Sequence, residues 1–90
     1  METTVTEDLE AISIGDLLSS KLILINDSVN SFDWVIQCLV VILGHSPLQA
    51  EQCVLITHYK GSCVIKEGSF EELKECRNKL INVKLNAIIK

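Results

Sequence analysis

Hydrophobic and polar positions along the chain predict three short strands. The apolar run at 22–25 is followed by the turn-forming segment Asn-Asp-Ser at 26–28, which is typical of a buried strand that enters a polar loop. A second strand is expected at 62–67, where apolar residues lie at the centre and Gly-Ser follows. A third is expected at 83–90, because apolar and polar residues alternate there with a period of two.

Three helices are predicted between these strands, from capping residues and from apolar residues three or four positions apart. N-caps are expected at Asn30 or Ser31, at Ser46 before Pro47 (with Gln49 completing a capping box), and at Ser69 (with Glu72), and helix ends at Gly44 and Gly61. The faces expected to be buried are Phe32, Val35, Ile36, Leu39, Val40 and Leu43 in the first helix, Ala50, Cys53, Val54, Thr57 and His58 in the second, and Phe70, Leu73, Cys76, Leu80 and Ile81 in the third.

This order of elements predicts the fold class α+β, with the sequence β-α-α-β-α-β. A compact solution is a small two-layer domain, in which a three-stranded, mostly antiparallel sheet is packed against three helices. We expect residues 21–90 to form this core. Residues 1–20 carry scattered apolar positions among acids and serines, and we interpret them as a flexible acidic arm.

Composition and charge exclude several kinds of partner. The chain has 90 residues, 48% of them hydrophobic, which suits one domain. Residues 1–20 hold five acids and no Lys or Arg, whereas 21–90 hold eight bases and seven acids, so no basic stripe is available for nucleic acid. The longest apolar run, 38–43, is far shorter than the roughly 20 residues of a membrane span. Because no secretory signal is visible at 1–10, we expect a cytoplasmic protein.

No catalytic or metal-binding constellation is convincing. The four cysteines, Cys38, Cys53, Cys63 and Cys76, form no C-x-x-C pair and are expected to be buried, reduced thiols. Cys53 and His58 are five positions apart on a predicted helix and therefore point in different directions. We expect no enzymatic activity, no metal and no cofactor.

Two polar features remain as candidates for binding. The cluster at 26–28 is explained by turn chemistry if taken alone, and His58 by a half-buried histidine on the apolar face of its helix. They gain a functional meaning only if the fold brings them together at a pocket between two helices.

Several of these residues carry a resemblance to the ClpS family, the small adaptors of the bacterial proteases ClpAP and ClpCP. Leu22 to Asp27 resembles the family's apolar strand followed by Asn-Asp-Asp, and Phe32 to Val35 occupies the place of its Met-Glu-Phe-Val. His58 to Gly61 is similar to the family's His-x-x-Gly, and Asn26 and His58 are 32 positions apart, as in the family. The match spans residues 21–90 without gaps.

This resemblance implies a non-enzymatic adaptor that binds N-degrons, which are substrates with a free, bulky apolar N-terminal residue, and delivers them to a AAA+ chaperone. It implies that Asn26 and His58 contact the α-ammonium group and that Asp27 supplies negative charge. The pocket for the first side chain would be lined by Phe32, Val35, Val54 and Thr57. Glu71 would dock on the N-terminal domain of a ClpA- or ClpC-type chaperone, and the arm would assist delivery by a monomeric adaptor.

The chain departs from the family pattern at three of these positions. Ser28 replaces the second Asp of Asn-Asp-Asp, Phe32 replaces a Met at the pocket gate, and Cys76 stands where a Lys is often found. An alternative is therefore a ClpS-like modulator that docks on the Clp chaperone without binding N-degrons. A third reading, a small enzyme, would require an exposed thiol near His58.

Overall fold

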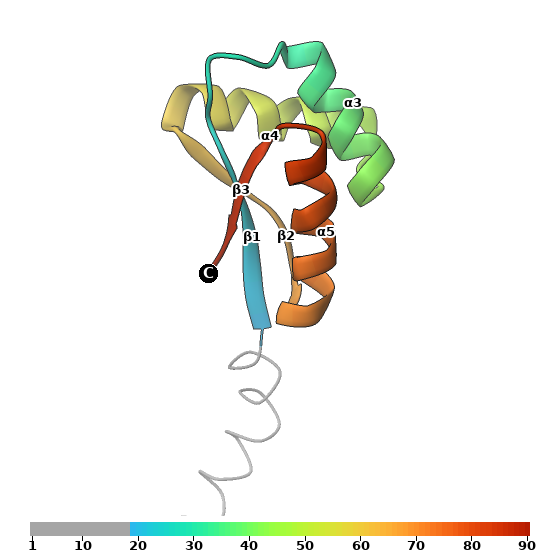
Figure 1. Ribbon diagram of the computed structural model, residues 1–90. Coiled ribbons are helices and arrows are strands. Elements are labelled where there is room, and N and C mark those ends of the chain that lie inside the picture. Colours follow the sequence, from blue (N-terminus) through green and yellow to red (C-terminus); the bar gives the residue numbers. More distant parts are fainter. Residues whose placement is uncertain (1–18) are drawn as a thin grey trace, which may run out of the picture.

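The computed structural model describes residues 19–90 and contains the predicted order of elements (Figure 1). The elements are β1 (Ser19–Ile25), α3 (Phe32–Leu43), α4 (Pro47–Lys60), β2 (Ser62–Ser69), α5 (Phe70–Asn82) and β3 (Asn86–Ile89). The predicted β-α-α-β-α-β order is confirmed. Residues 1–18 of the expected arm lie outside the described residues, and β1 begins at Ser19, two positions before the core that we expected.

The three strands form one sheet in the order β2-β1-β3, and both pairings are antiparallel. One irregularity interrupts the pairing of β1 with β2, because Leu22 faces Lys66 while Ile23 faces Val64. Ile65 is therefore an extra residue on β2, which is a β-bulge. The side-chain Nε2 of the buried His45 lies 2.8 Å from the Ile65 carbonyl oxygen and must donate to it, since a carbonyl only accepts.

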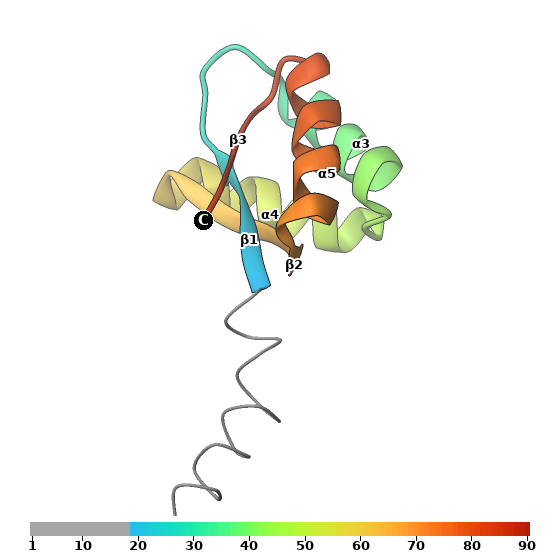
Figure 2. The ribbon, with the colours of Figure 1, turned by 60° about the horizontal axis from the view of Figure 1, so that its bottom comes forward.

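The three helices of residues 19–90 cover the sheet and enclose the core described there. Helix α5 contacts all three strands, α4 packs against β2, and α3 packs against α4 and α5. Figure 2 shows α5 running alongside the sheet. The largest fully buried side chains come from both layers: Leu22, Leu39, Leu73, Leu80 and Leu85. This confirms the predicted two-layer α+β architecture.

Capping residues set the helix boundaries where the sequence predicted them. The hydroxyls of Ser31, Ser46 and Ser69 each accept a hydrogen bond from the backbone N–H three positions later. Ser31, and not Asn30, is the cap of α3. Gly44 and Gly61 end α3 and α4 with φ angles of 75° and 94°, which glycine adopts without a steric penalty.

The third strand begins later than predicted. Residues 83–85 are not strand but the C-terminal closure of α5, in which the N–H of Leu85 donates to Leu80 and that of Lys84 donates to Ile81. Lys84 has a φ of 72°, a left-handed conformation usually taken by glycine. Because a lysine, and not a glycine, takes the left-handed position that ends this helix, the sequence gives no sign that the helix ends there.

Two further expectations about strands and burial are wrong. Strand β2 continues to Ser69 and is not broken at Gly68, so α5 follows it directly. Phe70 is 51% exposed although it was assigned to the buried face of α5, because it lies at the first helical position, beyond the sheet. Cys38 is buried as expected, whereas the other three cysteines are half-buried; all four thiols are free.

Candidate functional site

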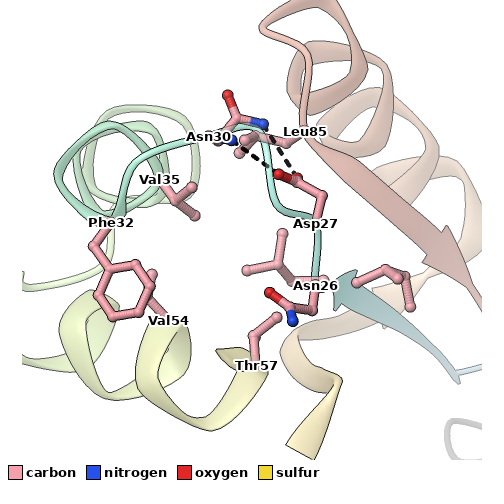
Figure 3. A pocket seen from close by; sticks show the side chains of 10 residues that line it. Asn26, Asp27, Asn30, Phe32, Val35, Val54, Thr57 and Leu85 are labelled. Carbon is pink, nitrogen blue, oxygen red and sulfur yellow. Dashed lines mark hydrogen bonds between the residues drawn. The ribbon is translucent and has the colours of Figure 1, made fainter. Parts of the chain in front are cut away.

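A cavity lies where β1 ends, between the loop that follows it and the two helices α3 and α4 (Figure 3). Its lining residues come from β1 and its loop, from both helices and from the segment before β3. They are Leu24, Ile25, Asn26, Asp27, Asn30, Phe32, Val35, Val54, Thr57 and Leu85. Six of the seven predicted substrate-binding residues are therefore neighbours around one cavity, although they are spread over 32 positions of the chain.

Asn26 is held at the cavity by the backbone. Its N–H donates to the Gly61 carbonyl oxygen at 2.9 Å, which ties the end of β1 to the turn after α4. In Figure 3 its carboxamide lies beside Thr57, on the side of the cavity opposite Phe32. The Thr57 hydroxyl donates to the Cys53 carbonyl at 2.7 Å and can still accept a hydrogen bond.

Among residues 19–90, Asp27 is the only charged residue that lines the cavity. Its Oδ1 accepts from the backbone N–H groups of Val29 and Asn30, both at 2.9 Å, and its Oδ2 accepts from the Asn30 side chain at 3.1 Å. Partial burial raises the pKa of this carboxyl, but the three hydrogen bonds outweigh burial and leave the pKa below its ordinary value. Asp27 is thus an anion near pH 7, and no cation of residues 19–90 forms an ion pair with it.

Asn30 is a lining residue that the sequence reasoning did not assign to the site. Its Nδ2 donates both to Asp27 and, at 2.9 Å, to the carbonyl oxygen of Lys84. The carboxamide therefore joins the loop after β1 to the turn before β3, which also brings Leu85 to the cavity. A side chain three positions after an aspartate in a turn was a usable signal for the first contact, but nothing local signalled the second.

The opposite wall of the cavity is apolar and the space is small. Val35 and Val54 are buried, whereas Phe32 is 42% exposed. The cavity has a volume of about 30 Å³, and a single water needs roughly 10–15 Å³ of such space. As it stands, this space therefore suits only a small group.

His58 does not line the cavity. It is exposed, contrary to its expected place on the buried face of α4, because it lies past Thr57 near the end of the helix. Its ring packs edge-to-face against Phe32, with the centroids 5.0 Å apart, and against Tyr59 at the same separation. His58 thus contacts the side of the cavity opposite Asn26, through Phe32, and the two residues do not meet in a shared wall.

The remaining features restrict what chemistry the site can perform. No cysteine lines the cavity, and burial raises the pKa of the half-buried Cys53 thiol to about 11, assisted by the neighbouring Cys63. Within residues 19–90 no group of three or more His, Cys, Asp or Glu could hold a metal ion.

The helices described here include none that is long and apolar enough to cross a membrane. Glu71 lies exposed in the first turn of α5, away from the cavity.

Comparison with solved structures supports the fold. The chain is similar to a structure described as ClpS2 of Agrobacterium tumefaciens bound to L-phenylalaninamide, with 18% sequence identity and a TM-score of 0.71. The match covers 80% of this chain and 94% of the other. A search of curated proteins finds no match.

Comparison with family models gives the assignment. The model of the ATP-dependent Clp protease adaptor protein ClpS matches residues 19–87, which begin with β1 and extend into β3. The match includes every lining residue of the cavity, and the three-stranded sheet with three helices is the fold of that family. The chain therefore belongs to the ClpS family, the adaptors of ATP-dependent Clp proteases.

Proposed function

We propose that this adaptor binds polypeptides through a free N-terminal residue with an apolar side chain and delivers them to a Clp chaperone. The observation that supports this most is the pairing of two chemistries in one cavity. The Asp27 carboxylate and the Asn26 carboxamide lie on one side, and the apolar side chains of Phe32, Val35 and Val54 lie on the other.

An N-terminal residue presents the complementary pair of groups. Its α-amine has an ordinary pKa of about 7.7–8.0 and is mostly protonated near pH 7. A hydrogen bond between charged groups contributes about 1.5–3 kcal/mol, and burial of a Leu or Phe side chain roughly 1.5–3 kcal/mol. Since no cation of the described chain is paired with Asp27, its charge is available to an incoming ammonium group.

The similar structure supports the same class of ligand. Agrobacterium tumefaciens ClpS2 is described as bound to L-phenylalaninamide, a molecule with a free α-amine next to an apolar side chain. At 18% identity this likeness concerns the fold, so the ligand is carried to this chain only as part of the proposal.

The first side chain would enter between Phe32 and Thr57. The cavity of about 30 Å³ is too small for a phenyl or isobutyl group. The half-exposed ring of Phe32 is packed against the exposed His58, so it can turn outward without opening the core. We therefore expect Phe32 to limit the size of accepted residues and His58 to act on binding through the position of that ring.

A peptide-binding panel tests the proposal. Fluorescence anisotropy would compare peptides that differ only in their first residue, each with a free and an acetylated N-terminus. We expect free Leu or Phe peptides to bind and Asp27→Asn to weaken them roughly 10- to 150-fold, the equivalent of one charge-assisted hydrogen bond. Asp33→Asn, an exposed carboxylate in the first turn of α3, is the matched control. Equal binding of free and acetylated peptides would contradict recognition of the ammonium group.

Delivery would use a different face of the molecule. The exposed Glu71 on α5 would contact the N-terminal domain of a ClpA- or ClpC-type chaperone, leaving the cavity open to substrate. The four free thiols are compatible with the reducing cytoplasm, where we place the protein.

A second candidate function keeps the chaperone and omits the substrate. Ser28, exposed beside Asp27, carries no charge where the family has a second carboxylate, and the cavity is small. Such a protein would bind the chaperone domain and modulate its use of other substrates. Chaperone binding together with no response to any first residue in the panel would select this function.

A further inference from the structure

A second concave surface lies between α5 and β3. We refer to it as the α5–β3 groove, and it is lined by Phe70, Lys74, Arg77, Asn78, Ile88 and Ile89. Its volume is about 360 Å³, far more than that of the cavity beside Asp27. None of these residues has a part in the proposed binding of substrates.

The α5–β3 groove has an apolar floor that no described residue covers. Phe70 is 51% exposed, and Ile89, which stands opposite the buried Leu22 and so lies on the helix-covered face of the sheet, is half-buried beside it. Ile88 stands opposite Ile23, and its side chain points to the other face. Phe70 was expected in the core, and its place here is the reason that expectation is wrong. Large apolar side chains clustered in a concave surface are typical of a site that receives another segment.

Two cations border this floor. Arg77 donates through Nε to the carbonyl oxygen of Ala87 at 2.9 Å, which holds its guanidinium along β3 and leaves its other N–H groups free to donate. Lys74 lies one helical turn before Arg77. Neither forms an ion pair with any residue in 19–90. The groove therefore suits a segment that carries both carboxylates and apolar side chains.

The chain contains such a segment immediately before the described domain. Residues 7–18 hold four acids, Glu7, Asp8, Glu10 and Asp16, and no Lys or Arg. The same stretch holds the apolar residues Leu9, Ile12, Ile14, Leu17 and Leu18. Its composition is thus complementary to the groove in both charge and hydropathy.

The point where this segment joins the domain is next to the groove. Ser19 pairs with Ser69, the residue that precedes Phe70, so β1 begins beside one end of the floor. On the other flank, Lys21 exchanges two backbone hydrogen bonds with Lys90, directly after Ile89. An extended chain covers roughly 3.3 Å per residue and a helix rises about 1.5 Å per residue. Four or five residues therefore suffice to follow α5 from Phe70 to Asn78.

We infer that residues 7–18 of this chain dock in the α5–β3 groove, with apolar side chains on Phe70 and Ile89 and carboxylates at Lys74 and Arg77. The contact is intramolecular, because the segment is tethered beside the groove and its local concentration is high. Docking there requires the chain to turn back just before β1, and Gly15 and Asp16 are residue types that favour such a turn.

Nuclear magnetic resonance of the full chain tests this inference. We expect nuclear Overhauser contacts from the methyl groups of Ile12 and Ile14 to the Phe70 ring and the Ile89 methyl groups. The charged part of the contact should respond to salt, since the Debye length falls from about 30 Å at 0.01 M to about 3 Å at 1 M. An absence of these contacts at low salt, or contacts to Ile23 and Val64 on the open face of the sheet instead, would overturn the inference.

Charge variants provide the quantitative test. An exposed ion pair changes an equilibrium constant by roughly 1.4- to 5-fold. Lys74→Gln combined with Arg77→Gln should therefore lower the docked-to-free ratio about 2- to 25-fold, as read from the Ile89 chemical shifts. Lys60→Gln, an exposed cation at the end of α4, is the matched control and should change nothing. An unchanged ratio in the double variant would contradict the roles of both cations.

A second set of variants distinguishes a loss of docking from a disturbance of the folded domain. Because Arg77 also binds the Ala87 carbonyl, its replacement can disturb β3. Replacing Glu7, Asp8, Glu10 and Asp16 by their amides leaves residues 19–90 untouched and should weaken docking in the same direction. Contacts between labelled and unlabelled copies in a mixed sample would show that the segment docks on a second copy, and would overturn the intramolecular assignment.

Discussion

At the scale of single residues, Asp27 links the stability of the loop to its charge. The carboxylate accepts three hydrogen bonds from Val29 and Asn30, and these bonds keep its pKa below the ordinary value. A carboxyl with a lowered pKa in the folded state stabilises the fold at pH values above its ordinary pKa. That contribution is lost as the pH falls through the lowered value.

We therefore expect part of the free energy of unfolding to disappear below about pH 4, where carboxyl groups begin to protonate. Urea unfolding at pH 7 and pH 3 would measure this loss in the natural sequence and in Asp27→Asn. The variant should be less stable at pH 7, and its loss between the two pH values should be smaller. Equal pH dependence in both proteins would show that Asp27 contributes nothing through its charge.

The two histidines should differ in how much each contributes to the stability of the fold. His45 is 8% exposed and donates to the carbonyl of Ile65, whereas His58 is exposed and contacts only other rings among the interactions described. His45→Ala should lower the free energy of unfolding by roughly 1–3 kcal/mol, because it leaves a buried carbonyl without a donor. His58→Ala should change it by less than about 0.5 kcal/mol. Thermal or urea unfolding measures both, and a reversed order would contradict this assignment.

At this scale the sequence predicted which residues line the cavity better than it predicted which of them contact one another. Asn26, Asp27, Phe32, Val35, Val54 and Thr57 line one cavity, and their roles in binding stay predictions. His58 was expected to be half-buried because the helical period brings it near the apolar face. The period cannot distinguish a ring that points into a cavity from one that packs on the outside of Phe32. The bond from Asn30 to Lys84 spans 54 positions and has no local signal.

At the scale of elements, the stability of α4 depends on its first turn. The Ser46 hydroxyl accepts from the backbone N–H of Gln49 at 3.1 Å, and Pro47 follows the cap. Ser46→Ala should destabilise the protein by about 0.5–2 kcal/mol, the usual range for a lost N-cap. Ser62→Ala, an exposed serine at the start of β2, is the matched control and should have a much smaller effect. Chemical denaturation compares the two, and equal effects would contradict a capping role.

Element boundaries were predictable wherever a cap or a glycine marks them. Ser31, Ser46, Ser69, Gly44 and Gly61 all act as their residue types suggest. The segment 83–85 was assigned to a strand because its alternating pattern is genuine, since Leu85 is buried and Lys84 is exposed. What the pattern could not show is that a lysine adopts the left-handed conformation there. An alternating pattern of apolar and polar residues carries no information about whether a backbone φ angle is positive or negative.

At the scale of the whole molecule, the reactivity of the thiols reports the integrity of the fold. Cys38 is 6% exposed, and burial, aided by Cys63, raises the pKa of Cys53 to about 11. At pH 8 only about one Cys53 in a thousand would then be a thiolate, the form that reacts with alkylating reagents. We expect both residues to be labelled slowly in the native protein and rapidly in urea. Mass spectrometry after timed labelling would show this, and rapid native labelling of Cys53 would contradict it.

The topology as a whole followed from the order of the elements, because three short strands and three amphipathic helices have few compact arrangements. The expected β-α-α-β-α-β domain is confirmed, and so is membership of the ClpS family. The α5–β3 groove was not predicted, because it depends on β2 continuing to Ser69 and placing Phe70 outside the sheet. A groove of this kind depends on the exact residue at which a strand ends and the next helix begins.

The bulge at Ile65 limits how the length of the chain can change. Lys66 and Cys63 both stand opposite buried positions of β1, Leu22 and Leu24, although they are three positions apart, which a regular strand would place on opposite faces. Deleting Ile65 would leave Lys66 and Cys63 two positions apart and on one face, as in a regular ladder, but it would remove a buried side chain of the core. It would also remove the carbonyl that His45 binds. Relatives that keep the His45 contact should therefore tolerate substitutions along β2 far better than gaps.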